Sequence, residues 1–202
     1  MKIHWENIYQ TKSLQEVSWY QPIPQTSLDL IADHGLPKTA RIIDVGGGDS
    51  FLVDHLLNLG YQQITVLDIS EAALSRAQAR LGPRADAVTW IACDIRDFVP
   101  QQSYDCWHDR AAFHFLTATN DIHAYSKLVA RSVGAGGYLI LGTFSEQGPT
   151  KCSGITIQQY SPETMQAQFG ADFMPLQFLQ TDHPTPFGTH QNFVFGAFER
   201  RK

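Results

Sequence analysis

The segment that most constrains the fold is IIDVGGGDS at residues 42–50, where an apolar strand-like run leads into three consecutive glycines. Gly46, Gly47 and Gly48 tolerate positive φ values and let a ligand approach the backbone closely. A helix-like segment follows, and the free N–H groups at a helix N-terminus favour an anionic or polar ligand. The segment predicts a strand–loop–helix unit that holds a nucleotide or a carboxylate-bearing ligand. A tight turn without a ligand is the alternative.

Short apolar runs alternate with helix-like segments along most of the chain. The runs are rich in Ile, Val and Leu and barely alternate with polar residues, which is typical of parallel strands covered on both faces. Strand–helix alternation of this kind predicts βαβ units and a parallel sheet. The expected strands are 41–45, 64–69, 88–92, 104–107 and 138–144, and the expected helices are 51–59, 71–81 and 121–133.

The two ends of the chain depart from this alternation. A short helix is expected from Ser161-Pro162 to Gly170, and two strands at 176–180 and 192–200 then follow without a helix between them, which predicts an antiparallel hairpin at the sheet edge. Residues 1–37 form an expected N-terminal arm with one helix near 27–34. Its aromatic residues Trp5, Trp19 and Tyr20 are candidates for a lid, and packing of the arm on the core is the alternative. We therefore expect an arm at 1–37 and a main domain at 38–202.

Composition narrows the functional class. The 202 residues fit one domain, and 15 basic against 20 acidic residues give a net charge of −5, which argues against a nucleic-acid-binding face. Three widely spaced cysteines indicate neither a disulfide framework nor a C-x-x-C metal site. We see no signal peptide and no apolar stretch long enough to span a membrane. A cytoplasmic protein is expected.

Three aspartates stand at the ends of successive strands. Asp44 comes two residues before the first glycine, where it suits a cationic ligand group better than a pyrophosphate. Asp68 ends the second strand, where a carboxylate can bind a ribose diol, and Asp94 follows the third strand, near the place expected for an adenine edge. A dinucleotide fingerprint would need glycine at position 51, where the chain has Phe51. This opposes a nicotinamide-dependent oxidoreductase.

With these residues, the chain resembles the class I S-adenosylmethionine-dependent methyltransferases. The resemblance rests on DVGGG at 44–48, Asp68 in VLD and Asp94 in ACD, and covers residues 38–202. It implies a three-layer Rossmann-like α/β fold with a seven-stranded, mostly parallel sheet ending in an antiparallel hairpin. It also implies that S-adenosyl-L-methionine binds and S-adenosyl-L-homocysteine is released. The glycine loop would hold the methionine part, Asp68 the ribose and Asp94 the adenine, and the further candidate contacts are Ile69, Ile95, Trp19 and Tyr20.

The segment WHDRAAFHFL at 107–116 supplies the catalytic candidates, because the acceptor meets the methyl group at the end of the fourth strand in this family. His108 or Asp109 is a candidate to take a proton, and Arg110 is a candidate to bind a carboxylate at two points. His114 is a further candidate. The alternatives are a structural Asp109–Arg110 ion pair and a core histidine at 114.

Cys152, His183 and His190 form a second group, expected in loops on the acceptor side, without an assigned role. With His108 and His114 they would make a pocket rich in thiol and imidazole, but no pair has a recognised metal spacing, so we expect no bound metal.

Three functions remain. The first is a methyltransferase acting on a small molecule. The main alternative acceptor is a protein lysine, because WENIY and SWYQ near the N-terminus are similar to a methyltransferase subgroup with protein-lysine members. The other alternative is a non-catalytic cofactor- or partner-binding module of the same fold.

Overall fold

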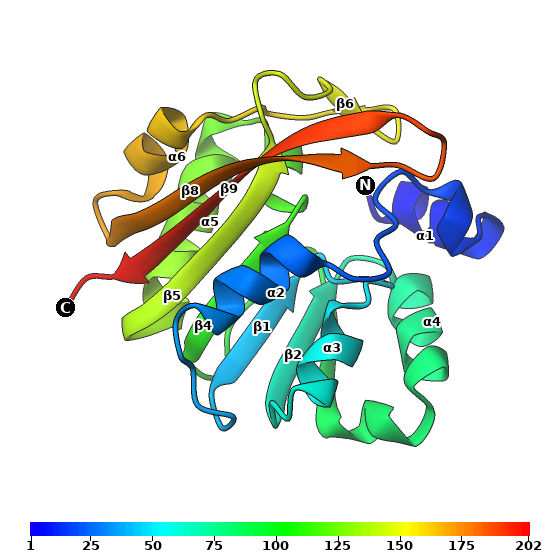
Figure 1. Cartoon of the computed structure of the whole chain (residues 1–202), viewed down its shortest axis with the longest axis horizontal. Helices are drawn as coiled ribbons and strands as arrows, with labels where there is room; N and C mark the ends of the chain where they lie inside the picture. Colours follow the sequence, from blue (N-terminus) through cyan, green and yellow to red (C-terminus); the bar gives the residue numbers. More distant parts are fainter.

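A seven-stranded sheet forms the centre of the molecule, described here from a computed structural model of residues 1–202. The strand order is β3-β2-β1-β4-β5-β9-β8 (Figure 1). The first five strands are mutually parallel, and β9 is antiparallel to both β5 and β8. The strands are β1 (Arg41–Val45), β2 (Gln63–Asp68), β3 (Val88–Ala92), β4 (Tyr104–Arg110), β5 (Val133–Phe144), β8 (Phe173–Pro184) and β9 (His190–Arg200).

Helices cover both faces of the sheet and make the fold three-layered. The core on one face contains side chains of α2 (Gln25–Ala32), α3 (Leu52–Asn58) and α4 (Glu71–Leu81). The core on the other face contains side chains of α5 (Thr119–Ser132) and α6 (Pro162–Phe169), and Figure 1 shows α2 and α5 on opposite sides of β5. Covering on both faces explains the continuous apolar runs of the parallel strands. The expected Rossmann-like α/β fold is confirmed.

Several element boundaries agree with the sequence-based expectations because their signals are local. Ser70 caps α4 through a hydrogen bond from the Ala73 N–H, and Gly82 ends that helix with φ +58°. The C-terminal hairpin is confirmed, although β8 and β9 are longer than expected. Strand β5 is also longer and begins at Val133, where the expected helix was to end. The sequence analysis did not predict the small hairpin of β6 (Lys151–Cys152) and β7 (Ile155–Thr156).

The N-terminal arm has two parts that pack differently. Helix α1 (Lys2–Thr11) lies beside α4, near the ends of β1 and β2 where the arrows point in Figure 1. Helix α2 belongs to the main core, where Leu28, Leu30 and Ile31 are buried. The domain boundary at residue 37 stays a prediction, but α2 is an integral layer of the sheet rather than an appendage.

Short 3₁₀ helices complete the chain at Leu14–Glu16, Gly82–Ala87 and Phe113–Phe115. No helix has the length and apolar character needed to cross a membrane.

Candidate active site

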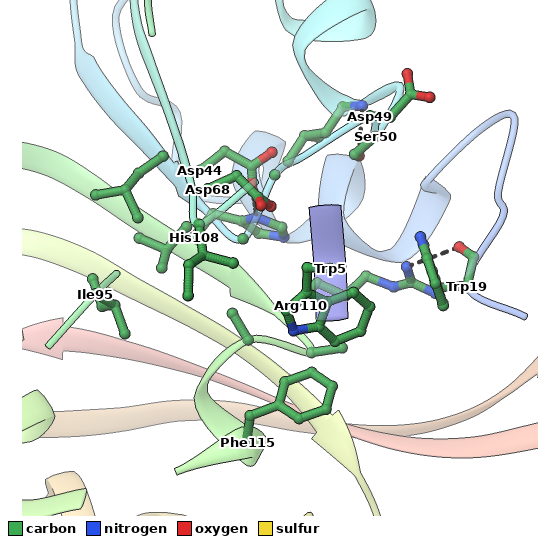
Figure 2. Close-up of a pocket in the computed structure, with 18 of the residues that line it drawn as sticks. Trp5, Trp19, Asp44, Asp49, Ser50, Asp68, Ile95, His108, Arg110 and Phe115 are labelled. Carbon is green, nitrogen blue, oxygen red and sulfur yellow. Dashed lines mark hydrogen bonds and ion pairs between the residues drawn. The ribbon is translucent and has the colours of Figure 1, made fainter. Parts of the chain in front are cut away.

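A deep pocket lies at the carboxyl ends of β1, β2 and β4. It has a volume of about 1250 Å³, mouth included, and is lined by 31 residues, 18 of them hydrophobic. Figure 2 shows Asp44, Asp68 and His108 on one side of this pocket and Trp5, Arg110 and Phe115 on another. Ligands of open α/β sheets bind at this edge, so the pocket is the candidate active site.

The glycine loop forms the floor of the pocket with a backbone that excludes side chains. Gly46 has a φ of +69°, and a Cβ atom there would stand 2.5 Å from the Cβ of Ala112. A Cβ on Gly47 would stand 2.6 Å from Oδ2 of Asp44, and one on Gly48 would stand 2.9 Å from Oδ2 of Asp68. The glycines therefore let the loop pass directly between the two carboxylates. Gly46 and Gly47 line the pocket, whereas Gly48, also predicted to contact the cofactor, does not.

A buried chain of hydrogen bonds joins Asp44 to the N-terminal arm. Nδ1 of His108 lies 2.7 Å from Oδ1 of Asp44, and Nε2 lies 2.8 Å from the hydroxyl of Ser27. Asp44 and His108 are register partners on β1 and β4, so their side chains share one face of the sheet. All three residues line the pocket and are almost completely buried. Both ring nitrogens of His108 are engaged, so the ring has no free site for a proton from a ligand unless Ser27 moves.

Asp68 is a buried carboxylate at the end of β2. Its Oδ1 accepts a hydrogen bond from the Ser70 N–H at 2.8 Å, and it lines the pocket. Burial, with a smaller contribution from the charge of Asp44, raises the pKa of Asp68 to about 7. The carboxylate is thus poorly solvated, and hydrogen bonds from a ligand diol would offset that cost.

Asp94 lies on the pocket wall beyond β3 with Ile95, and both were predicted there. Its carboxylate accepts hydrogen bonds from the Arg96 guanidinium at 3.0 and 2.6 Å, and this pairing lowers the pKa of Asp94. A carboxylate has about four acceptor positions, so the pair leaves room for a further donor such as an adenine amino group. Ile69 also lines the pocket.

Aromatic side chains from the arm cover the pocket. The ring of Trp5 makes edge contacts with Trp19 at 5.6 Å and with Phe115 at 5.2 Å between centroids. Tyr20 packs edge-on against Phe51 at 6.2 Å. All five residues line the pocket. The arm packs on the core and also lines the pocket, and a lid role for its aromatic residues stays a prediction.

Arg110 enters the pocket from the end of β4. Its guanidinium makes one hydrogen bond, a long one of 3.4 Å to the Trp19 carbonyl, drawn as a dashed line in Figure 2. It also lies 4.9 Å from the centre of the Phe193 ring, a cation–π distance. Burial lowers the pKa of Arg110 to about 10, where it is still charged at neutral pH.

Asp109 and His114 do not line the pocket. Side chains alternate along a strand, so His108 and Arg110 share one face of β4 while Asp109 points to the other. Its carboxylate accepts hydrogen bonds from the Tyr125 hydroxyl at 2.6 Å and from the N–H groups of Ala112 and Phe113. Neither a catalytic role for Asp109 nor the alternative Asp109–Arg110 ion pair agrees with this geometry. The period-two alternation of a strand was the signal that would have shown this.

His114 is a core histidine, as the alternative reading held. It is fully buried between Phe115 and Phe144. Burial and the nearby Arg110 lower its pKa to about 3, so the ring is neutral. This position places it outside the acceptor side that was expected for it.

Of the second predicted group, Cys152, His183 and His190, only Cys152 lies in the pocket. Cys152 on β6 lines the pocket, and burial raises the pKa of its thiol to about 11. His183 is buried outside the pocket, where Nε2 lies 2.8 Å from the Ser18 carbonyl, and His190 is exposed at the start of β9. No group of three or more His, Cys, Asp or Glu side chains is arranged to hold a metal ion.

The sequence analysis missed three residues that shape the site. Ser27 completes the hydrogen-bond chain from the arm, and Phe115 completes the aromatic cover. Asp49 anchors the glycine loop through ion pairs with Arg76, at 2.9 Å, and with Arg80. The position of Asp49 beside the glycines was a usable signal, whereas nothing local marks Ser27 or Phe115.

Comparisons with known proteins agree with this site. A family model described as a methyltransferase domain matches residues 42–137, which contain the glycine loop and the three aspartates. Over its whole length the chain superposes on a structure from work on the conversion of a disulfide bond into a thioacetal group during echinomycin biosynthesis. That match has a TM-score of 0.80 and 19% identity and covers 93% of that chain. Residues 42–137 therefore match a methyltransferase domain, and the chain has the fold of solved S-adenosylmethionine-dependent methyltransferases.

Two further matches are to methyltransferases of different kinds. The 1,6-didemethyltoxoflavin-N1-methyltransferase of Burkholderia thailandensis was solved with bound 1,6-didemethyltoxoflavin and S-adenosylhomocysteine. That match has a TM-score of 0.71 and 15% identity, over 100% of this chain and 84% of that one. The eEF1A lysine and N-terminal methyltransferase of Mus musculus is 26% identical over 92 residues. The match covers 46% of this chain and only 13% of that protein.

Proposed function

We propose that this methyltransferase moves a methyl group from S-adenosyl-L-methionine to a small-molecule acceptor. The observation that carries the proposal is that Asp44, Asp68 and Asp94, from the ends of three successive strands, line one pocket beside a glycine loop. The aromatic side chains of the arm cover this pocket. That cover favours an acceptor small enough to enter the pocket over one that remains on the surface.

The residues present fit the cofactor. Gly46 and Gly47 line the pocket without side chains, so a ligand can lie against the backbone there. We assign the methionine part to this loop and to Asp44, the ribose to Asp68 and the adenine to Asp94, with Ile69 and Ile95 beside the base. When bound, S-adenosylmethionine supplies a methyl group already activated on a positively charged sulfur. The rings of Trp19 and Tyr20 would favour such a cation by about 0.5–2 kcal/mol each.

The protein's own contribution to the reaction is orientation and exclusion of water. Holding two reactants in line can supply about 7–11 kcal/mol of the barrier. The aromatic cover of Trp5, Trp19 and Phe115 would keep water out, and Arg110 stands on the acceptor side. Among the predicted catalytic residues, His108 stays the candidate proton acceptor. A proton would reach it through the Ser27 hydroxyl or after that hydrogen bond opens.

A protein lysine is the alternative acceptor. The match to the eEF1A lysine and N-terminal methyltransferase supports it, although it reaches only a small part of that protein. A non-catalytic binding module is the other alternative, and the presence of all three carboxylates on the pocket wall speaks against it. A cytoplasmic location also stays a prediction, based on the three unpaired cysteines.

Calorimetry with S-adenosylhomocysteine tests the cofactor assignment. We expect binding, and we expect Asp68→Ala to weaken it at least tenfold; no binding at millimolar ligand would end the proposal. Titration with NADH serves as the control for an oxidoreductase. Incubation with radiolabelled S-adenosylmethionine and either a metabolite extract or a protein extract then separates small acceptors from protein acceptors. Label found only in protein would favour the lysine alternative.

A further inference from the structure

The acceptor side of the pocket contains an arginine whose hydrogen-bonding capacity is nearly unused. A guanidinium carries five N–H donors, and that of Arg110 uses one, over 3.4 Å to the Trp19 carbonyl. No carboxylate forms an ion pair with it, whereas Arg96, the other arginine on the pocket wall, is paired with Asp94. The charge is therefore partly desolvated, faces the cavity and lacks an anionic partner.

The surroundings of Arg110 separate it from the proposed ribose and adenine contacts of the cofactor. Its guanidinium lies over the Phe193 ring of β9, and the ionisable groups near enough to act on its charge are Asp44 on β1 and, more weakly, Cys152 on β6. Strand β9 lies beyond β5 in the sheet order, whereas Asp68 and Asp94 lie on the side of β2 and β3. Arg110 thus stands apart from Asp68 and Asp94, beside apolar and thiol side chains, with Asp44 as the nearest of the three carboxylates.

The backbone around Arg110 is held in a strained conformation. Ala111 and Ser153 are the two residues other than glycine that have positive φ, at +66° and +49°. Ala111 directly follows Arg110, and Ser153 directly follows Cys152. Arg110 and Cys152 both line the pocket. Strain of this kind costs about 1–3 kcal/mol and is concentrated at ligand-binding sites.

From these contacts we infer that the methyl acceptor is an anion, a small apolar or aromatic carboxylate whose carboxylate binds Arg110 and whose body packs against Cys152 and Phe115, which line the pocket. A carboxylate accepts two parallel N–H bonds from a guanidinium, which uses the free donors and fixes the acceptor's orientation. The inference rests on the proposed methyltransferase function and adds the chemical class of its acceptor.

Binding of benzoate to the protein saturated with S-adenosylhomocysteine tests this inference, with benzamide as the uncharged isostere and inorganic phosphate as the alternative anion. We expect benzoate to bind at least tenfold more tightly than benzamide to the unmodified protein. Equal binding of the two would overturn the inference, and so would binding of phosphate without binding of benzoate. Since this comparison needs no variant, it holds even where a substitution at Arg110 impairs folding.

Arg110→Met, with Arg110→Lys as the charge-retaining control, identifies the residue responsible. We expect Arg110→Met to abolish the preference for benzoate, Arg110→Lys to retain part of it, and the affinity for S-adenosylhomocysteine to stay within twofold. Arg110 could instead bind the carboxylate of the cofactor's amino-acid part. Methylthioadenosine lacks that part and therefore tests this alternative. If Arg110→Met weakened S-adenosylhomocysteine tenfold but left methylthioadenosine unchanged, Arg110 would serve the cofactor and the inference would be wrong. Absence of S-adenosylhomocysteine binding in the unmodified protein would instead overturn the proposed function.

Discussion

His108 and Asp44 face each other across neighbouring parallel strands, with Nδ1 of the imidazole 2.7 Å from Oδ1 of the carboxylate. Each is almost completely buried, and Ser27 occupies the other ring nitrogen. The contact gives the Asp44 carboxylate a hydrogen-bond donor in a poorly solvated place. It also ties the second helix of the N-terminal arm to the wall of the cofactor pocket.

The buried pair predicts unequal effects on stability. His108→Ala leaves the Asp44 carboxylate without a partner, and breaking a buried pair in this way typically costs about 3–5 kcal/mol. Ser27→Ala removes a neutral donor at the far end of the chain and should cost about 1–3 kcal/mol. Urea unfolding followed by circular dichroism measures both. Equal costs for the two variants would show that Asp44 does not depend on the ring of His108.

The protonation state of Asp68 predicts a pH dependence of cofactor binding. Its pKa is raised from 3.8 to about 7 in the folded protein. Since a ribose diol needs a carboxylate acceptor, the affinity for S-adenosylhomocysteine should fall as the pH is lowered below about 7. Calorimetry between about pH 5 and pH 8 measures this fall, and Asp68→Asn should bind weakly with a much flatter profile. A variant with the same pH profile as the unmodified protein would assign the effect to another group.

The same shift has a consequence for stability, whose sign follows from linkage. A carboxyl group with a higher pKa in the folded than in the unfolded state binds more protons when folded. The free energy of unfolding should therefore decrease as the pH rises from about 4 to about 7, the window between the two pKa values. Comparing Asp68→Asn with the unmodified protein isolates this contribution, because the asparagine does not titrate.

The arm is held to the main domain by a helix cap that comes from another helix. The carboxylate of Glu6 on α1 accepts hydrogen bonds from the N–H groups of Glu71, at 2.6 Å, and Ala72, at 3.1 Å, in the first turn of α4. Glu6→Gln removes the charge at this helix N-terminus and should weaken docking of the arm by about 1 kcal/mol. Faster trypsin cleavage at Lys12 would report the loosening.

Lys2 supplies the matched control for that experiment. Its ion pair with Glu71 joins the same two helices but is exposed on both sides. Such pairs contribute little to stability, so Lys2→Met should leave the cleavage rate at Lys12 nearly unchanged. If both variants were cleaved equally fast, the cap would not be what holds the arm.

Ala111 is held in a conformation that suits glycine, with φ at +66°. Ala111→Gly removes the Cβ strain and should keep the free energy of unfolding or raise it by up to about 1 kcal/mol. Ala112→Gly is the neighbouring control, since its φ is −104° and it should lose about 0.5–1 kcal/mol. Thermal unfolding of the two variants checks the difference, and a clear loss for Ala111→Gly would contradict the strain.

The alternation of apolar runs and capped helices was enough to predict the layers of the fold. The strand β1 was predicted with its observed bounds because its apolar residues Ile42, Ile43 and Val45 lead directly into the glycine loop. The helix α4 was predicted as well, because Ser70 and Gly82 act on the residues next to them. The positions of Asp44, Asp68 and Asp94 at successive strand ends followed from the same reasoning, and the pocket brings the three together.

What the sequence by itself determined is whatever depends on neighbours along the chain: the strands, the caps, the glycine loop and the strand-end carboxylates. The tertiary structure decided which side chains meet across long separations. Ser27 and His108 are hydrogen-bonded although 81 positions separate them along the chain. Arg110 donates a hydrogen bond to the Trp19 carbonyl across a separation of 91 positions. Local sequence patterns do not predict such contacts, because the contacts form only when the arm packs over the sheet. That packing buries His108 between Asp44 and Ser27, and it leaves Arg110 with unused N–H donors inside the pocket.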